Sequence, residues 1–161
     1  MINMASKRKF TYYFIAVLSL ISVDQISKMF FISYLKTQSG YTIKALPILD
    51  IVYAWNYGIS FGLFREYYQY SNLVFAILNG LIILYLIYTL CRTNYFLSQL
   101  GLVFIIGGAL GNLTDRILLG AVFDFIYFHY QGFAFPAFNL ADSFITIGAC
   151  LFIYDSIFSK K

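Results

Sequence analysis

The sequence predicts an all-α integral membrane protein with four transmembrane helices. Hydrophobic residues make up 61% of the 161 positions and charged residues 11%, whereas a soluble domain typically has roughly 45–50% apolar and about 25% charged residues. The mean hydropathy is +0.76, and the apolar residues gather in four runs of roughly 20, the length that a helix needs to cross a bilayer. We therefore expect a single multi-pass membrane domain.

The charge and cysteine patterns exclude several other classes. The formal net charge is +4, but the basic residues lie mainly at the ends of the apolar runs, so nucleic acid is not an expected partner. Cys91 and Cys150 lie in apolar segments without CxxC or Cys/His spacing. We expect buried free thiols there, and no disulfide, metal site or cofactor.

The first predicted span covers residues 10–32 and follows the basic triplet Lys7, Arg8 and Lys9. This opening resembles a secretory signal peptide, but the apolar run is too long and no small-residue cleavage site follows it, so we expect an uncleaved span. Asp24 and Lys28 lie four residues apart within it, on one helical face. They are interpreted either as a structural pair snorkelling toward the outer surface or as support for a nearby active site.

Residues 33–70 are predicted to form a small extracytoplasmic platform. The stretch YTIKALPILDIVYAWNYGISFG is rich in β-branched and aromatic residues and is interrupted by Pro47 and Gly58, which favours short strands. An open sheet cannot cross the hydrocarbon core, because its edges would lack hydrogen-bond partners. We therefore expect a sheet lying on the outer surface, followed by an interfacial helix or loop in LFREYYQYSN.

Three further spans are predicted at residues 71–91, 95–115 and 138–158. Asn79 and Gly80 interrupt the first of these, and helix packing explains both. Gly107 and Gly111 in the next have the GxxxG spacing that lets another helix approach closely. Four spans place both termini in the cytoplasm, a topology that the Lys/Arg distribution supports only modestly, with six at the inner and five at the outer ends.

This topology gathers polar residues at the outer end of the bundle. Asn112, Asp115 and Arg116 share one helical face, as do Asn139 and Asp142, and we expect Arg116 to pair with a carboxylate. Asp124 lies in the β-like stretch AVFDFIYF between the two groups. Two neighbouring aspartates resist double ionisation, so one can activate water while the other donates a proton. The residues alone leave three possibilities open: a catalytic pair, a structural polar network or an ion pathway.

Four motifs narrow these possibilities. In this order, VDQISK, NYGISFG, GGALGNLTDRILLGAVFDFI and FNLADS resemble the motifs of lipoprotein signal peptidase (signal peptidase II), and they span most of the chain from Asp24 to Ser143. The resemblance implies that Asp124 and Asp142 are the catalytic pair. It also implies supporting roles for six polar residues, namely Asp24, Asn56, Asn112, Asp115, Arg116 and Asn139. Phe135 stands where the family often has Trp.

The resemblance also implies the reaction and its setting. It implies an aspartic endopeptidase of the bacterial cytoplasmic (inner) membrane, with its active site at the extracytoplasmic face and with no cofactor. The substrate would be a diacylglyceryl-modified prolipoprotein, cleaved just before the lipidated cysteine, while residues 53–64 clamp the extracytoplasmic side. Membrane lipid and the cyclic-peptide inhibitors of the family are the other expected ligands, and a monomer is the expected state.

Three rival interpretations have weaker support. Ser33 and Lys36 form an SxxK pattern that Ser–Lys hydrolases use, but such spacings recur by chance and no oxyanion hole is indicated nearby. His129 has no partner at metal-ligand spacing, so a place in the interfacial aromatic belt is expected for it. A transporter would place charges near the bilayer midplane within repeated halves, whereas these charges cluster at one face.

Overall fold

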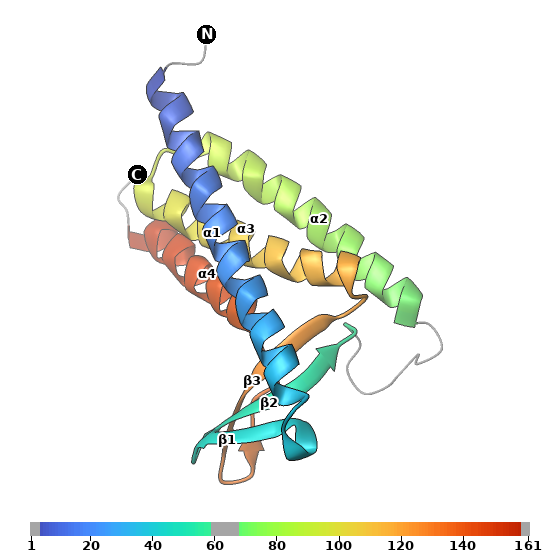
Figure 1. The fold of residues 1–161 in the computed structure, drawn as a ribbon. Coiled ribbons are helices and arrows are strands. Elements are labelled where there is room, and N and C mark those ends of the chain that lie inside the picture. Colours follow the sequence, from blue (N-terminus) through green and yellow to red (C-terminus); the bar gives the residue numbers. More distant parts are fainter. Residues whose placement is uncertain (1–3, 59–67, 159–161) are drawn as a thin grey trace.

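The computed structural model describes residues 4–58 and 68–158 as four long helices and a four-stranded sheet (Figure 1). The helices are α1 (Met4–Leu35), α2 (Tyr68–Arg92), α3 (Phe96–Leu118) and α4 (Leu140–Phe158). Each contains an apolar stretch of at least 19 residues that is long enough to cross a membrane. The four predicted spans are therefore confirmed, with bounds that differ by a few residues at most ends.

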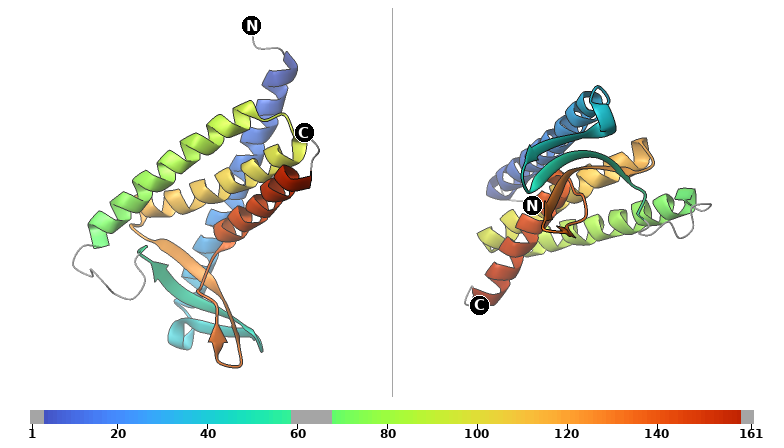
Figure 2. Two further views of the ribbon diagram at one scale, coloured as in Figure 1. Left: turned by 180° about the vertical axis from the view of Figure 1, so that it is seen from behind. Right: turned by 90° about the horizontal axis from the view of Figure 1, so that it is seen from below.

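Helix α3 is the centre of the bundle and packs against the other three helices (Figures 1 and 2). Its small residues permit this. A Cβ atom on Gly107 would lie 2.7 Å from Leu20 of α1, and one on Gly111 would lie 2.7 Å from Asp24. The GxxxG spacing predicted a close helix contact, and the structure identifies the partner as α1. Asn79 of α2 donates a hydrogen bond to the carbonyl of Ala109, 3.1 Å away, which fixes α2 against α3.

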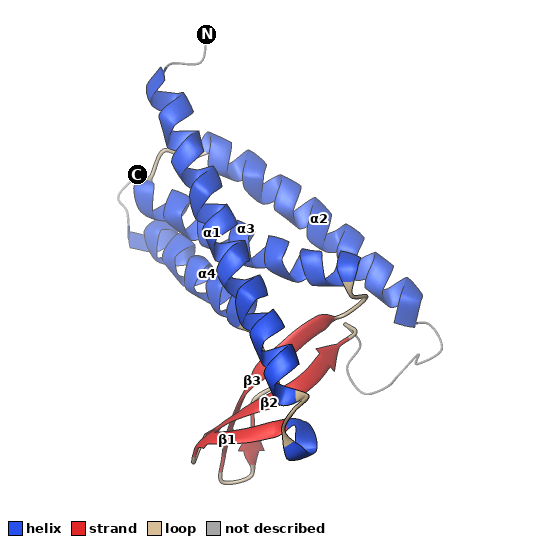
Figure 3. Cartoon of the chain, in the orientation of Figure 1, coloured by secondary structure: helices blue, strands red, loops and turns tan. Residues whose placement is uncertain are grey.

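The sheet lies at one end of the bundle (Figure 3). Its strands β1 (Thr42–Leu46), β2 (Leu49–Asn56), β3 (Val122–Tyr130) and β4 (Phe133–Ala134) are antiparallel and follow the order β1-β2-β3-β4. The sequence predicted a sheet within residues 33–70 and a β-like stretch around Asp124. The structure joins the two, because β2 pairs with β3 in a register that places Ala54 opposite Asp124.

An apolar cluster attaches the sheet to the bundle. Leu35 of α1 and Phe123 and Phe125 of β3 are almost fully buried together, and the ring of Phe31 stacks on that of Phe125 at 4.5 Å. On the other side of β3, Phe138 exchanges backbone hydrogen bonds with Ile126 immediately before α4 begins. Strand β3 is therefore held between the end of α1 and the start of α4.

The environment of the two cysteines differs from the expectation. Cys91 and Cys150 are free, but both are exposed and not buried, because a single bundle of four helices leaves the outer faces of α2 and α4 without a protein neighbour. The first half of the predicted interfacial helix, residues 63–67, lies outside the described residues, and from Tyr68 onward the chain is already α2.

Candidate active site

A polar cluster fills the space between the sheet and the adjoining ends of α1, α3 and α4. Seven of the eight residues singled out from the sequence are connected within it through hydrogen bonds and ion pairs. These seven are Asp24, Asn56, Asn112, Asp115, Asp124, Asn139 and Asp142.

The N-terminus of α4 positions Asp142. Asn139 immediately precedes the helix, and its side-chain oxygen accepts a hydrogen bond from the Asp142 backbone N–H at 3.0 Å. In return, the Asp142 carboxylate accepts one from the Asn139 backbone N–H at 3.2 Å. This reciprocal arrangement is a capping box, in which residues three positions apart satisfy the free amides of a helix start. The local sequence FNLADS therefore explains why this carboxylate has a fixed orientation.

Strand β3 positions Asp124, whose side chain is 3% exposed. One carboxylate oxygen accepts a hydrogen bond from the Asn139 side-chain amide at 2.7 Å, and the other accepts one from Asn56 at 3.1 Å. Burial raises the pKa of Asp124 from its ordinary value of 3.8 to about 6; the negative charge of Asp142 acts in the same direction, and the two amide donors oppose it.

Asn139 and Asn112 connect the two aspartates. The fully buried Asn139 contacts Asp124 through its side chain and Asp142 through its backbone. Asn112 donates to the second oxygen of Asp142 at 2.8 Å, and its own oxygen accepts from Asn139 at 3.2 Å. The two aspartates are thus held near one another by shared amides, with Asp124 buried and Asp142 partly exposed.

Lys28 is part of this network, and the snorkelling interpretation of the Asp24–Lys28 pair is wrong. Only 2% of the Lys28 side chain is exposed, and its ammonium lies 2.8 Å from both Asp24 and Asp115. It also donates a hydrogen bond to the oxygen of Asn112 at 3.1 Å. Because an ammonium can only donate, it fixes the orientation of the Asn112 amide, whose NH₂ group must then face Asp142.

The two carboxylates around Lys28 also fix backbone. Asp24 accepts the N–H of Ala141 at 2.9 Å, in the first turn of α4. Asp115 accepts the N–H of Phe123 at 3.2 Å, at the start of β3. Buried charges are tolerated when they are paired and hydrogen-bonded, and here the pairing also places the two segments that carry Asp124 and Asp142.

Arg116 does not form the carboxylate pair expected from the sequence. No ion pair to it occurs among the described residues. Its guanidinium instead lies over the ring of Phe75 in α2, 5.2 Å from the ring centroid, as a cation–π contact. One buried guanidinium nitrogen, Nη1, has no hydrogen-bond partner within residues 4–58 and 68–158. Arg116 is therefore the member of the predicted set that the structure leaves outside the hydrogen-bonded cluster.

The rival motifs lie elsewhere. Ser33 and Lys36 are exposed at the end of α1, away from the cluster. His129 is partly exposed on β3, with its Nε2 atom 3.2 Å from a carboxylate oxygen of Asp50. Within residues 4–58 and 68–158, no three His, Cys, Asp or Glu side chains are grouped so that they could hold a metal ion.

The sequence interpretation missed two contributors to this region. Gln25 donates to Asp115 at 2.8 Å and also contacts Asp24, and Asn72 donates to the backbone carbonyl of Arg116 at 2.9 Å. Both are amides within or beside apolar runs, where polar groups are costly. The cost of placing an amide in an apolar run is the feature of the sequence that could have indicated both residues.

The fold and the cluster together define a multi-pass membrane protein with a polar site where the bundle meets an external sheet. Comparisons with known proteins give the family. The family model described as signal peptidase (SPase) II matches residues 15–158. The lipoprotein signal peptidase of Rickettsia felis is 54% identical over 145 residues, which cover 90% of this chain and 74% of that protein. That of Rickettsia prowazekii is 47% identical over 163 residues, covering 100% and 84%.

Solved structures share this fold. Two structures described as a bacterial membrane enzyme superpose on this chain with TM-scores of 0.77 and 0.78, at 29% and 28% identity. They cover 94% and 93% of this chain, and the matched parts are 92% and 95% of theirs. The chain therefore belongs to the signal peptidase II family, a family of membrane proteases that cleave signal peptides from prolipoproteins.

Proposed function

We propose that this chain is an aspartic endopeptidase that acts on diacylglyceryl-modified prolipoproteins and cleaves the bond just before the lipidated cysteine. The observation that carries the proposal is the contact of one buried residue, Asn139, with both Asp124 and Asp142. A single rigid amide thereby holds two carboxylates at the mouth of an apolar bundle, the arrangement that acid–base hydrolysis of a peptide bond requires.

The environments of the two aspartates suggest different roles. Asp142 accepts hydrogen bonds from Asn112 and Asn139 and lies in the first turn of α4, where free amides stabilise negative charge. Asp124 is buried, and its pKa is raised to about 6. Asp124 is therefore the proton carrier and Asp142 the base. A peptide covering the site would exclude water and raise the proton affinity of Asp124 further.

The reaction then follows from these roles. Asp142 takes a proton from a water molecule as its oxygen attacks the carbonyl carbon, and Asp124 gives its proton to the carbonyl oxygen. When the tetrahedral intermediate collapses, the proton held by Asp142 passes to the amide nitrogen and the carbon–nitrogen bond breaks. The hydroxyl proton returns to Asp124. One water molecule is consumed, and both carboxyl groups regain their starting states.

The lipid of the substrate explains how a peptide bond reaches this depth. A polar peptide resists entry into an apolar region because its backbone groups lose water. Each buried methylene of an acyl chain contributes about 0.8 kcal/mol, so two chains hold the substrate at the bilayer surface. The exposed apolar faces of α1, α2 and α4 offer room for these chains.

The orientation follows the charge pattern and the fold. The start of α1 and the end of α4 lie at the end of the bundle remote from the sheet (Figures 1 and 2), and Lys9 and Arg92 belong to that end. We place it in the cytoplasm of a bacterium by the positive-inside rule. The sheet and the site then lie at the extracytoplasmic face of the inner membrane, and a monomer contains every residue of the site.

One experiment tests the proposal directly. The purified protein is incubated with a lipidated prolipoprotein, and the products are measured by mass spectrometry. Asp124→Asn and Asp142→Asn should each abolish cleavage while the protein remains folded. Asp50→Asn, on the same sheet but outside the cluster, serves as the matched control and should retain activity. Near-normal cleavage by either cluster variant would show that the polar network is structural and not a catalytic pair.

A further inference from the structure

The hairpin between β3 and β4 exposes several aromatic rings. Residues 130–138, YQGFAFPAF, contain no Asp, Glu, Lys, Arg or His. Phe133 is 83% exposed, and Tyr130 and Phe135 are each 61% exposed. A contiguous exposed apolar patch of this kind usually marks a contact with another molecule or with lipid.

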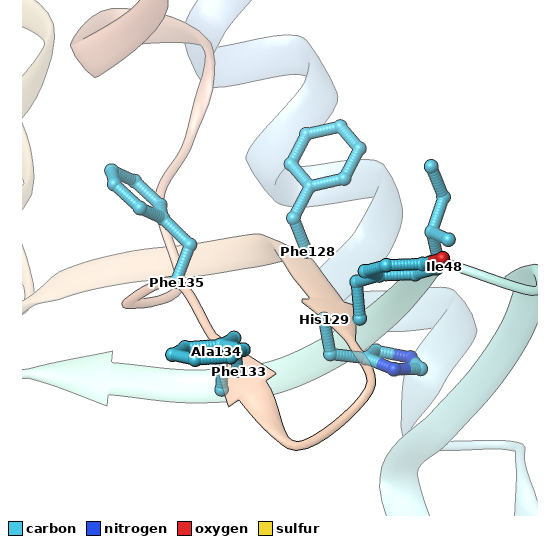
Figure 4. Close-up of a pocket in the computed structure, with 7 residues that line it drawn as sticks. Ile48, Phe128, His129, Phe133, Ala134 and Phe135 are labelled. Atoms are coloured by element: carbon cyan, nitrogen blue, oxygen red, sulfur yellow. The ribbon is translucent and has the colours of Figure 1, made fainter.

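The same rings border a shallow cavity of about 330 Å³ (Figure 4). Its lining is mainly apolar, with Ile48 of the β1–β2 turn and Phe128, Phe133 and Phe135 of the hairpin, and it also includes His129. In that view the side chains of Phe128, Phe135 and Ile48 point to one side of the hairpin, whereas the imidazole of His129 lies on the other. The cavity therefore belongs to an apolar side of the sheet.

Strand alternation shows which side this is. Successive side chains of a strand point to opposite faces, so Phe128 shares the face of Asp124 and Ile126. Asp124 contacts Asn139 at the start of α4. The face that carries Phe128 is therefore the one on which α4 begins, whereas Phe123 and Phe125 on the opposite face pack against α1.

The opposite face of the same end of the sheet is charged. In the strand register, Lys44 of β1 lies opposite Asp50 of β2, and Asp50 lies opposite Tyr127 of β3. Because paired residues share a face, these side chains lie together with His129, whose Nε2 is 3.2 Å from Asp50. This end of the sheet is thus amphipathic, with ionisable groups on one face and phenylalanines on the other.

The position of α4 identifies what covers the apolar face. The ring of Phe138 stacks on Phe128 with centroids 5.9 Å apart, and Phe135 packs against Phe138 at 5.8 Å. Phe138 is two residues before Leu140, where the membrane-crossing helix begins. These rings therefore lie at the level where α4 leaves the bilayer, the depth at which aromatic side chains concentrate.

We propose that the apolar face of this hairpin inserts into the adjoining lipid leaflet and anchors the distal end of the sheet to the membrane surface. The charged face with Lys44, Asp50 and His129 then meets water. Anchoring of this kind limits rocking of β3, the strand that carries Asp124, relative to α4, which carries Asp142. The inference concerns the bilayer and does not depend on the proteolytic activity.

Tryptophan fluorescence with depth-selective quenchers tests this proposal. The chain has one tryptophan, so Phe133→Trp and Phe135→Trp are made in a Trp55→Phe background and reconstituted into phosphatidylcholine vesicles with brominated acyl chains. Both variants should show blue-shifted emission, strong quenching by the bromines and loss of quenching by aqueous iodide. Lys44→Trp, on the charged face of the same sheet, is the matched control and should show the reverse pattern.

Two outcomes would overturn the proposal. Iodide quenching of Phe133→Trp and Phe135→Trp equal to that of Lys44→Trp would place the hairpin in water. Protection from both quenchers would show that protein, such as a second copy of the chain, covers the face. If Trp55→Phe impairs folding, the same substitutions in the otherwise unaltered chain give the result as a difference from the parent emission.

Discussion

Replacing Asp124 by asparagine should change how the stability of the protein depends on pH. Burial raises the pKa of this carboxyl from 3.8 to about 6 in the folded chain. At about 1.4 kcal/mol for each pKa unit, ionising Asp124 costs the folded state roughly 3 kcal/mol relative to the unfolded state. The folded state binds the proton more tightly, so this stability is fully present below about pH 4 and is lost as the pH rises through about 6.

Thermal unfolding in detergent at several pH values between 4 and 8 measures the effect. A chain of this length shifts its melting temperature by roughly 2–4 °C per kcal/mol, which corresponds to roughly 6–12 °C across this window. Asp124→Asn also leaves one amide donor, from Asn56 or Asn139, without an acceptor, at about 1–3 kcal/mol. That loss is the same at every pH. The difference in melting temperature between the variant and the parent should therefore move in favour of the variant as the pH rises.

A comparison of the pH profiles of the parent and Asp124→Asn separates Asp124 from the other ionisable groups. All other residues are the same in both proteins, so only the difference between the two profiles isolates Asp124. Asp50→Asn, the matched substitution on the same sheet outside the cluster, shows what the loss of an aspartate alone does to the profile. Parallel profiles for the parent and Asp124→Asn would mean that Asp124 ionises in the folded protein as easily as in the unfolded chain, and its assignment as proton carrier would fail.

Three more predictions follow from the same contacts. Asn139→Ala should reduce both cleavage and melting temperature more than Asn112→Ala, since only Asn139 touches both aspartates and caps α4; equal effects measured by turnover and unfolding would contradict this. Lys28→Met should reduce kcat by a larger factor than it changes KM. If Lys28 acts through the Asn112 amide, the reduction in kcat should be smaller when Lys28→Met is made in an Asn112→Ala background. Lys36→Met, at an exposed position, is the control and should retain kcat. A prolipoprotein whose lipid-bearing cysteine is replaced by serine should be cleaved far more slowly in the same detergent, and comparable rates would argue against lipid anchoring.

Hydropathy and residue order were enough to predict much of the fold. The four spans are long, mainly apolar stretches, so their helices follow from the need to satisfy backbone groups inside the bilayer. The strands around Thr42–Asn56 and Val122–Tyr130 follow from β-branched and aromatic residues interrupted by turn residues. The pairing of β2 with β3 could not be predicted, because it joins segments that α2 and α3 separate in the sequence.

The residues of the candidate site were predictable as a set, but their contacts were not. Spacing placed Asp24 and Lys28 on one face of a helix, yet it could not show that Asp115 would approach from α3 and bury the ammonium. Spacing likewise gave no information on the position of Phe75, which replaces the expected carboxylate partner of Arg116. Such contacts depend on how helices rotate against each other, and rotation is set by packing in three dimensions.

The capping box at the start of α4 makes Asp142 a residue on which both folding and chemistry depend. Asp142→Ala would leave the backbone amide of Asn139 without its acceptor and weaken the start of the helix. Inactivity of this variant would therefore not distinguish lost catalysis from lost structure. Asparagine keeps an oxygen that can accept the same hydrogen bond. A protein that binds its substrate without cleaving it, for use in trapping the complex, is therefore best made by Asp142→Asn, and the fold itself restricts which substitutions this position can tolerate.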